Sequence, residues 1–308
     1  MSINNKKEEN IIIQVDTISR LHEISGLSKP NHPLVTIIDY SKVKNAEIPS
    51  VPVKFVLELY SVNYKKHCKF VYGRQKFDHQ EGTLHCTAPG QVIEFDPERE
   101  EGSTDGWGLY FHPELIRNSS LAKKIHEFTF FSYNENEALH LSEQEKQTLL
   151  LLLKQMEKEY NTNIDHYSDD LIITNIELLL NYCKRYYGRQ FITRTNYNKD
   201  IITEFERFLS EYINSSQLKE KGVPSVKYCA EKMHLTPNYF SDLLKSETGK
   251  NTQEHIHYNL LEKAKTILLS TNSTVNEIAD ELGFEYPQYF SKLFKKKTGM
   301  IPTIFRAK

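Results

Sequence analysis

The sequence predicts an α+β protein with two domains. An antiparallel β-sandwich or small β-barrel and a helical connector are expected first, followed by an all-α C-terminal domain. Three observations lead to this fold class. The length of 308 residues is about twice that of a typical domain. Short apolar segments between turn residues occupy positions 34–112. After residue 113 the apolar residues recur at helical spacing.

The composition is that of a globular chain. Hydrophobic residues make up 39% and charged residues 26%, which excludes collagen-like, disordered and disulfide-scaffold classes. No apolar run approaches the ~20 residues that span a bilayer, and the polar N-terminus shows no secretory signal. The 4 cysteines form no CxxC pair. We therefore expect a reduced, cytoplasmic protein with no membrane partner and no zinc site.

The N-terminal strands are predicted from short runs rich in Val, Ile, Phe and Tyr, bounded by Gly and Pro. Their close spacing, with no helical segment between them, favours an antiparallel sandwich or small barrel. The expected strands cover residues 34–40, 53–62, 69–72, 83–88, 92–95 and 106–111.

Two long helices are expected in the connector. Ser142, with Glu145 three residues later, is a capping-box signature that predicts a helix to about residue 160. A broadly apolar stretch predicts a second helix over residues 168–187, which Gly188 would end. Both helices are too apolar to stand alone, and they could pack on the sheet or on a second subunit.

Domain boundaries follow from these changes of pattern. The polar stretch 193–199 lacks periodicity, so we expect an interdomain linker there and a helix over residues 200–213 after it. The predicted organisation is an N-terminal extension (1–33), a β domain that could bind an effector (34–116), a connector that could mediate dimerisation (117–192), the linker (193–199) and a helical domain (200–308).

An internal repeat is the most informative feature of the helical domain. Residues 238–245 (NYFSDLLK) and residues 288–295 (QYFSKLFK) align without gaps, and each segment continues to Thr-Gly. Each follows a short amphipathic helix and a tight connection, which is the helix-turn-helix layout. Motif one spans about residues 226–249 and motif two about residues 275–299.

Helical spacing gives the second helix of each motif an apolar and a polar face. A helix held by its apolar face can present a polar row to the major groove. There, Asn and Gln suit the adenine edge, and Lys suits guanine or a phosphate. The apolar faces are Phe240, Leu243 and Leu244 in motif one and Phe290, Leu293 and Phe294 in motif two; the polar rows are Asn238, Ser241, Asp242 and Lys245, and Gln288, Ser291, Lys292 and Lys295.

The net charge of -2 conceals a basic C-terminus. No acidic residue follows Glu285, whereas six Lys and Arg residues do. A charge run alone is more often a solvated face, but a local basic end also attracts a phosphate backbone. Between the motifs, an expected helix over residues 253–269 would hold the two reading helices roughly one turn of DNA, ~34 Å, apart. Together these features predict double-stranded DNA as the partner.

The two motifs carry a family signature. In motif two and just after it, the signature residues are Ile278-Ala279, Leu282-Gly283-Phe284, Tyr289-Phe290, Phe294-Lys295-Lys296, Gly299, Pro302 and Phe305-Arg306; motif one matches at Ala230, Leu235, Pro237, Tyr239-Phe240, Leu244-Lys245 and Gly249. Over residues 200–308 the chain thus resembles the AraC/XylS family of bacterial transcription regulators. The resemblance implies two DNA-binding motifs. In many members it also implies a cupin-like N-terminal domain that senses a small molecule or mediates dimerisation.

The resemblance also implies roles for individual residues. Base-reading candidates are Asn238, Ser241, Asp242, Gln288 and Lys292, and backbone-contact candidates are Tyr239, Lys245, Tyr289, Lys295, Lys296, Lys297 and Arg306. The chain departs from the family pattern at Leu260, where many members have Arg, at Pro287, often polar, and at Asp242, often basic. Because an acid repels phosphate, we expect motif one to read DNA more weakly than motif two.

A metal-dependent enzyme of the cupin type is the rival function. Such a site needs two or three His and a carboxylate around one metal. The β region offers His67, His79, His85 and Glu94, but no His-x-His pair that would place two ligands on one strand face. No nucleophile motif or phosphate-binding glycine loop occurs. We therefore expect no catalytic residues, no metal and no cofactor.

The role of the β domain stays open between two alternatives. Tyr60, Tyr72, Trp107 and Tyr110 could line an apolar effector pocket with hydroxyl groups for orientation. Aromatic residues of a sandwich more often form plain core, in which case the domain would only support a homodimer.

Overall fold

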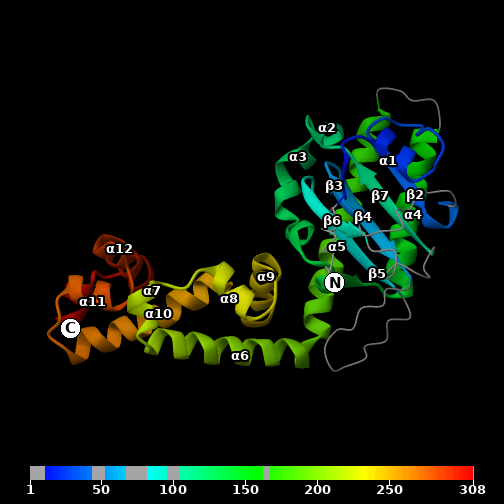
Figure 1. Ribbon diagram of the computed structural model, residues 1–308. Helices are drawn as coiled ribbons and strands as arrows, with labels where there is room; N and C mark the ends of the chain where they lie inside the picture. Colours follow the sequence, from blue (N-terminus) through cyan, green and yellow to red (C-terminus); the bar gives the residue numbers. More distant parts are fainter. Residues whose placement is uncertain (1–10, 44–52, 67–81, 96–104, 162–166, 308) are drawn as a thin grey trace, which may run out of the picture. The chain divides into compact units, whose positions relative to one another are not determined.

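The computed structural model describes residues 11–43, 53–66, 82–95, 105–161 and 167–307 (Figure 1). The chain divides into two compact units, Met1–Gln190 and Phe191–Lys308. Strands lie in the first unit and the second is helical, so the predicted α+β class is confirmed. The boundary falls within helix α5 (Ser168–Thr193), and the end of this helix from Phe191 onward belongs to the C-terminal unit.

Two β-sheets form the centre of the N-terminal unit. One has three strands in the order β1-β3-β6, and the other has five in the order β2-β7-β4-β5-β8. Pairing is antiparallel except between β1 and β3, which are parallel. The strands are β1 (Ile11–Val15), β2 (Val35–Asp39), β3 (Val53–Leu57), β4 (Tyr60–Lys65), β5 (Thr83–Thr87), β6 (Gln91–Phe95), β7 (Gly106–Phe111) and β8 (Leu139–His140).

The sheets differ from the expected arrangement in three respects. They do not close into a barrel within the described ranges. The strand expected over residues 53–62 is two strands, because the chain leaves the sheet after Leu57 and the Glu58 N–H bonds the Val15 carbonyl at 2.9 Å. Strand β1 and helix α1 (Ile18–Ile24) occupy part of the expected N-terminal extension. The strand expected over residues 69–72 lies outside the described residues.

The core of this unit lies on both faces of the five-stranded sheet. Val15, Ile18, Leu57 and Ile38 belong to one buried cluster that includes residues of both sheets. Helices α4 (Glu143–Asn161) and α5 cover the other face of the larger sheet (Figure 1). Shorter helical segments complete the unit: α2 (Pro113–Ile116), α3 (Ser120–Lys124), η1 (Tyr40–Lys42), η3 (Ile125–Glu127), η4 (Thr129–Ser132) and η5 (Glu135–Glu137).

The long helices confirm one sequence signal and correct another. At the start of α4, the Ser142 N–H donates to Glu145 Oε2 at 2.9 Å and the Glu145 N–H to Ser142 Oγ at 3.4 Å, as the capping box predicts. Helix α5, however, runs past Gly188 to Thr193. Gln190 keeps this extra turn in place, because its side chain bonds the His140 N–H at 2.8 Å and the Ala138 carbonyl at 3.2 Å.

Eight helices form the described part of the C-terminal unit. Helix α6 starts at Thr195, so most of the stretch expected to be a linker over residues 193–199 is helical. The local sequence is polar, but the buried Asn198 side chain ties this turn to its neighbours. The helices are α6 (Thr195–Asn214), α7 (Gln217–Lys221), α8 (Val226–Lys232), α9 (Pro237–Thr248), α10 (Thr252–Ser270), α11 (Val275–Glu281), α12 (Pro287–Thr298) and α13 (Pro302–Arg306).

None of the helices in the described ranges combines the length and hydropathy that crossing a bilayer requires.

Candidate nucleic-acid interface

Helix pairs α8–α9 and α11–α12 form two helix-turn-helix motifs that share several local hydrogen bonds. Ser225 caps α8 by accepting from the Tyr228 N–H, and Thr274 caps α11 in the same way from the Glu277 N–H. At the other end, the hydroxyls of Thr248 and Thr298 donate to the carbonyls four residues earlier, at 2.8 Å in both. The sequence repeat is therefore a structural repeat.

The turn of each motif contains one residue in the left-handed region. In motif two it is Gly283, with φ +72°, and in motif one it is His234, with φ +56°. The next residue in each motif closes the turn with a main-chain hydrogen bond. In motif one the Leu235 N–H donates to the Ala230 carbonyl at 3.0 Å, and in motif two the Phe284 N–H donates to the Ala279 carbonyl at 2.9 Å. Glycine adopts this conformation without steric cost, whereas a side chain at the same φ is strained.

Helices α9 and α12, which we call the recognition helices, are held by their apolar faces as predicted. Phe240 is buried and meets Phe205 of α6 edge-on, with ring centroids 4.9 Å apart. Phe290 and Phe294 are buried side by side in motif two, with centroids 5.7 Å apart. The apolar face fixes which residues of each recognition helix reach solvent.

The polar rows are accessible to different extents. Asn238 and Lys245 in α9 are exposed, as are Gln288, Lys292 and Lys295 in α12. Ser241 and Asp242 are half-buried, and the Ser241 hydroxyl lies 3.0 Å from the Thr252 hydroxyl of α10. The structure therefore presents the motif-two candidates more openly than those of motif one.

Two candidate backbone contacts have structural roles. Tyr239 is fully buried and its ring meets Phe191 at 5.1 Å, so its side chain cannot contact a phosphate in this conformation. Arg306 is half-buried. Its guanidinium donates to the carbonyls of Leu268, at 3.0 Å, and Ser273, at 2.5 Å, which joins α13 to the α10–α11 connection.

The remaining backbone candidates are exposed. The last turn of α12 contains Lys295, Lys296 and Lys297. Positive charge at this end of a helix interacts favourably with the helix dipole. Burial lowers the pKa of His257 in α10, and Lys297 and Lys296 lower it further through their charge. His257 is thus neutral at pH 7, and the local positive potential comes from the lysines.

The start of α12 carries an exposed tyrosine pair, formed by Tyr289, a predicted backbone contact, and Tyr286, which was not among the predicted site residues. Tyr289 is 60% exposed and Tyr286 is 46% exposed, and their rings meet edge-on at 5.6 Å. Tyr286 directly precedes Pro287, the first residue of the helix. The sequence signal that could have identified Tyr286 is an aromatic residue directly before the proline that begins a helix with a polar row.

Leu260, the departure from the family pattern in the spacer helix, is a core residue. It is 1% exposed in α10, where Ile256, Leu261 and Ala264 are also buried. An arginine at this position would lose packing and bury an unpaired charge. The local environment therefore explains why a leucine is present.

The effector candidates of the β domain do not share one surface. In the β4–β7 pairing Tyr60 lies opposite Phe111, and Ser61 lies opposite Tyr110. Because side chains alternate along a strand, Tyr60 and Tyr110 lie on opposite faces of the sheet. Trp107 lies on the same face as Tyr60. The Tyr60 ring stacks on that of Phe111, with ring centroids 5.0 Å apart. Tyr72 lies outside the described residues.

Tyr110 instead belongs to a polar network on the face toward the smaller sheet. The Tyr40 hydroxyl donates to Asn63 Oδ1 at 2.6 Å and lies 3.1 Å from the Tyr110 hydroxyl. Asn63 Nδ2 donates to Ser61 Oγ at 2.8 Å, and Ser61 shares a 2.6 Å hydrogen bond with Thr87. Burial raises the pKa of Tyr110, so its hydroxyl stays protonated at neutral pH.

The rival metal site gains no positive support. Over the described residues, no three His, Cys, Asp or Glu side chains are grouped so that they could hold a metal. His85 Nε2 lies 3.3 Å from the Tyr133 carbonyl, and burial lowers the pKa of this imidazole. His67 and His79 lie outside the described residues, as does the side chain of Glu94.

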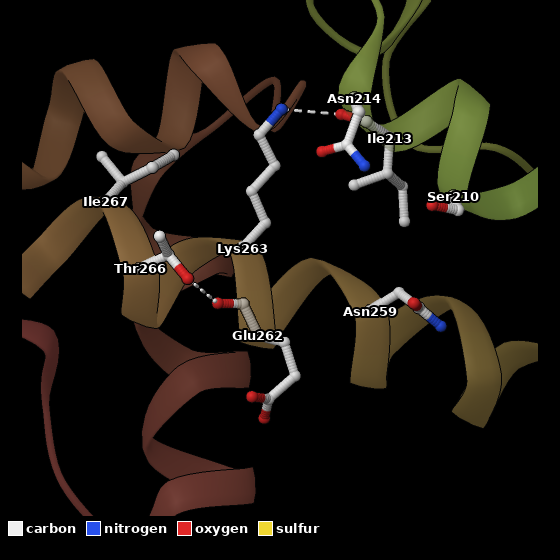
Figure 2. A pocket seen from close by; sticks show the side chains of 8 residues that line it. All are labelled: Ser210, Ile213, Asn214, Asn259, Glu262, Lys263, Thr266 and Ile267. Atoms are coloured by element: carbon white, nitrogen blue, oxygen red, sulfur yellow. Dashed lines mark hydrogen bonds between the residues drawn. The ribbon is translucent and has the colours of Figure 1, made fainter.

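A shallow cleft separates α6 from α10 in the C-terminal unit (Figure 2). Its central cation, Lys263 Nζ, donates to the Ile213 carbonyl at 2.7 Å and so caps the end of α6. The Thr266 hydroxyl donates to the Glu262 carbonyl at 3.1 Å (Figure 2). The Lys263 bond joins α10 to the end of α6, whereas the Thr266 bond lies within α10.

Residues 229–308 match the family model described as "Helix-turn-helix domain". The C-terminal unit contains a helix-turn-helix domain of the AraC type. Within this AraC-type domain, the matched region includes both recognition helices and most of α8.

Proteins similar to this chain are named as transcriptional regulators. YobQ of Bacillus subtilis, an uncharacterized HTH-type transcriptional regulator, is 38% identical over 82 residues, which are 27% of this chain and 34% of YobQ. YfiF of the same species, named likewise, is 30% identical over 161 residues, 52% of this chain and 48% of YfiF. The alignments therefore span between a third and a half of these relatives.

One similar solved structure is the C-terminal domain of the two-component response regulator yesN from Fusobacterium nucleatum. It is 29% identical to this chain and covers 35% of it and 98% of the solved chain, with a TM-score of 0.31.

Proposed function

We propose that this protein is a sequence-specific DNA-binding transcription regulator of the AraC type. The observation that carries the proposal is the pair of repeated motifs, each with a recognition helix buried on one face and polar on the other. The AraC-type domain and the names of the relatives support the same class. We place its activity in the cytoplasm, where the buried thiols of Cys86, Cys183 and Cys229 would remain reduced.

Motif two is the principal reader in this proposal. Gln288 and Lys292 are exposed one helical turn apart on α12, and they suit adenine and guanine edges in the major groove. Lys295, Lys296, Lys297 and Tyr289 would hold the helix against phosphates. In motif one, Asn238 is the exposed base reader and Lys245 the phosphate contact. Ser241 and Asp242 are half-buried and would add less.

The spacer helix supports simultaneous reading by both motifs. Helix α10 has 19 residues, and a helix of that length is about 28 Å long. This length is comparable with one turn of DNA, ~34 Å, which separates successive major-groove sites on one face of a duplex.

We also propose that the N-terminal unit binds a small polar effector between its two sheets. The supporting observation is the network formed by Tyr40, Ser61, Asn63, Thr87 and Tyr110, since buried polar groups in a sandwich need a reason to be retained. A ligand that bonds these groups would raise the melting temperature as its concentration exceeds its Kd. Absence of any shift across a metabolite panel would favour a scaffold without a ligand.

A homodimer formed through α5 is the remaining part of the proposal. Tyr167, Leu171 and Leu178 are 60%, 47% and 44% exposed at the 4 and 7 spacing of a coiled-coil seam. Acidic Asp170 and Glu177 lie in the first half of α5, where Glu177 also pairs with Lys124 at 2.9 Å, and basic Lys184 and Arg185 lie in the second half. An antiparallel second copy would place the acidic half of each helix opposite the basic half of the other.

Selection from a randomised pool of DNA duplexes tests this function without knowledge of the target. The proposal predicts enrichment of two short conserved boxes whose centres lie about one helical turn, 10–10.5 base pairs, apart. Enrichment of a single box would restrict reading to one motif. Recovery of unselected sequence by the folded protein would contradict sequence-specific binding.

A further inference from the structure

The end of helix α5 is attached to the recognition helix of motif one. Phe191, at the start of the C-terminal unit, is 5% exposed and its ring lies edge-on to that of Tyr239, with centroids 5.1 Å apart. Tyr239 is the third residue of α9 and is fully buried. The contact therefore fixes the end of α9 that would approach the DNA.

A buried amide strengthens this attachment. Asn198 of α6 is fully buried, and its Nδ2 group donates to the Phe191 carbonyl at 2.5 Å and to Glu247 Oε1 at 2.8 Å. One side chain thus bonds the end of α5 and the last turn of α9. Because the same amide makes both bonds, displacement of α5 would disturb its bond to α9.

Motif two has no equivalent attachment among the described residues. Its counterpart of Tyr239 is Tyr289, which is 60% exposed and meets the neighbouring Tyr286 ring. The first motif therefore has a connection to the helix that continues from the N-terminal unit, and the second motif lacks it within the described part of the chain.

We propose that Phe191 and Asn198 are positioning residues for α9, so that base reading by motif one depends on the end of α5 while motif two reads independently. This inference rests on the proposed DNA-binding function. It assigns the two motifs different tasks: motif two supplies constant recognition, and motif one supplies recognition that a change in α5 can weaken.

The test uses the full chain and a duplex selected by the wild-type protein. Base pairs whose preference is lost in Asn238→Ala define half-site one, and those lost in Gln288→Ala define half-site two. Affinities for duplexes with single base-pair changes are then measured for Asn198→Asp, Glu247→Gln, the double variant and Phe191→Ala. Phe208→Ala is the matched control, since its ring contacts Tyr212 of α6 and Tyr228 of α8.

Asn198→Asp places a carboxylate beside Glu247, and we expect discrimination at half-site one to fall about tenfold, with half-site two unchanged. Phe191→Ala should act in the same direction, and Phe208→Ala should not. Glu247→Gln retains an acceptor and should resemble the wild type. The double variant should recover part of the loss, because the amide introduced at position 247 can donate to the carboxylate introduced at position 198.

A merely structural role for these residues predicts something different. Partial unfolding lowers the active fraction, so affinity would fall for every duplex and the preference profile would keep its shape. A uniform loss of affinity of this kind would overturn the inference. So would variants whose base preferences and affinities equal those of the wild type, or a selected duplex in which no half-site can be assigned to motif one. If the wild-type protein selects no duplex at all, the proposed function fails and this inference fails with it.

Discussion

Tyr239 and Tyr289 occupy equivalent positions in the two motifs, yet Tyr239 is fully buried and Tyr289 is 60% exposed. Both follow the first polar residue of a recognition helix that begins with proline. Phe191 packs on the first tyrosine, and no ring contact of this kind is found at the second among the described residues. Two copies of one motif thus acquire different surfaces from their tertiary surroundings.

The turn of motif one should become more stable when His234 is replaced by glycine. His234 has φ +56°, where a side chain costs about 1 kcal/mol relative to glycine. His234→Gly should therefore raise the melting temperature of the C-terminal unit by a few degrees. Gly283→Ala is the opposite control, since its Cβ would overlap the Leu218 carbonyl and the residue has φ +72°. A lower melting temperature for His234→Gly would show that the imidazole itself stabilises the turn.

Stability should depend on the ionisation of Cys229 at high pH. Burial raises the pKa of this thiol from 9.0 to about 12. Below pH 9 the thiol is protonated in both states; between 9 and 12 only the unfolded chain ionises, so stability falls as the pH rises.

The difference in unfolding free energy between wild type and Cys229→Ala, from urea titrations, should shift against the wild type by about 1.4 kcal/mol between pH 8 and pH 10. Tyrosines and lysines titrate in both proteins, so their contributions to the difference in unfolding free energy cancel. The same difference in unfolding free energy at pH 8 and pH 10 would mean that the thiol ionises in the folded protein as it does in the unfolded chain.

Charge placed on the α5 seam should dissociate the proposed dimer. Leu171→Glu combined with Leu178→Glu puts carboxylates beside Asp170 and Glu177 in an interface that would otherwise be apolar. We expect the dimer dissociation constant from sedimentation equilibrium to rise at least about tenfold. Leu151→Glu on α4 is the control, as Leu151 is 62% exposed but lies off the seam. A monomeric wild type, or equal effects of seam and control variants, would rule out this interface.

The lysines that end α12 should determine affinity without determining sequence. Replacing Lys295, Lys296 and Lys297 with Gln would remove as many as three phosphate contacts, each adding about -0.9 to the slope of log K against log salt. Fluorescence anisotropy should show a shallower slope and the same ratio of selected to scrambled affinity. A changed ratio with an unchanged slope would mean that these lysines contact bases.

Some of this structure was readable from the sequence because the signals are local. Helical spacing predicted the buried Phe240 and Phe290, and the Ser142–Glu145 capping box forms as expected. Gly188 failed as a helix end because the buried Gln190 bonds the β8 region and holds the extra turn. The polar 195–199 turn is helical for a similar reason, the long-range bonds of Asn198.

The candidate site shows the same division. Exposure of Gln288 and Lys292 follows from the period of α12 alone. Tyr239 is buried against Phe191, and Arg306 bonds the carbonyls of Leu268 and Ser273, and these partners lie far away in the chain. The grouping of Tyr60 with Tyr110 failed because only the strand register shows on which face a residue lies.

Fluorescence anisotropy across a salt series, with the full chain, a selected duplex and its scrambled control, shows whether α12 reads base sequence. Wild type, Gln288→Ala and Lys292→Ala should be compared. We expect selective, salt-dependent binding by the wild type, with selectivity reduced by about 1–3 kcal/mol at one base pair in each variant and little change of the salt slope. Equal affinity of the wild type for both duplexes, or variants that retain full selectivity, would contradict a regulator that reads DNA through α12.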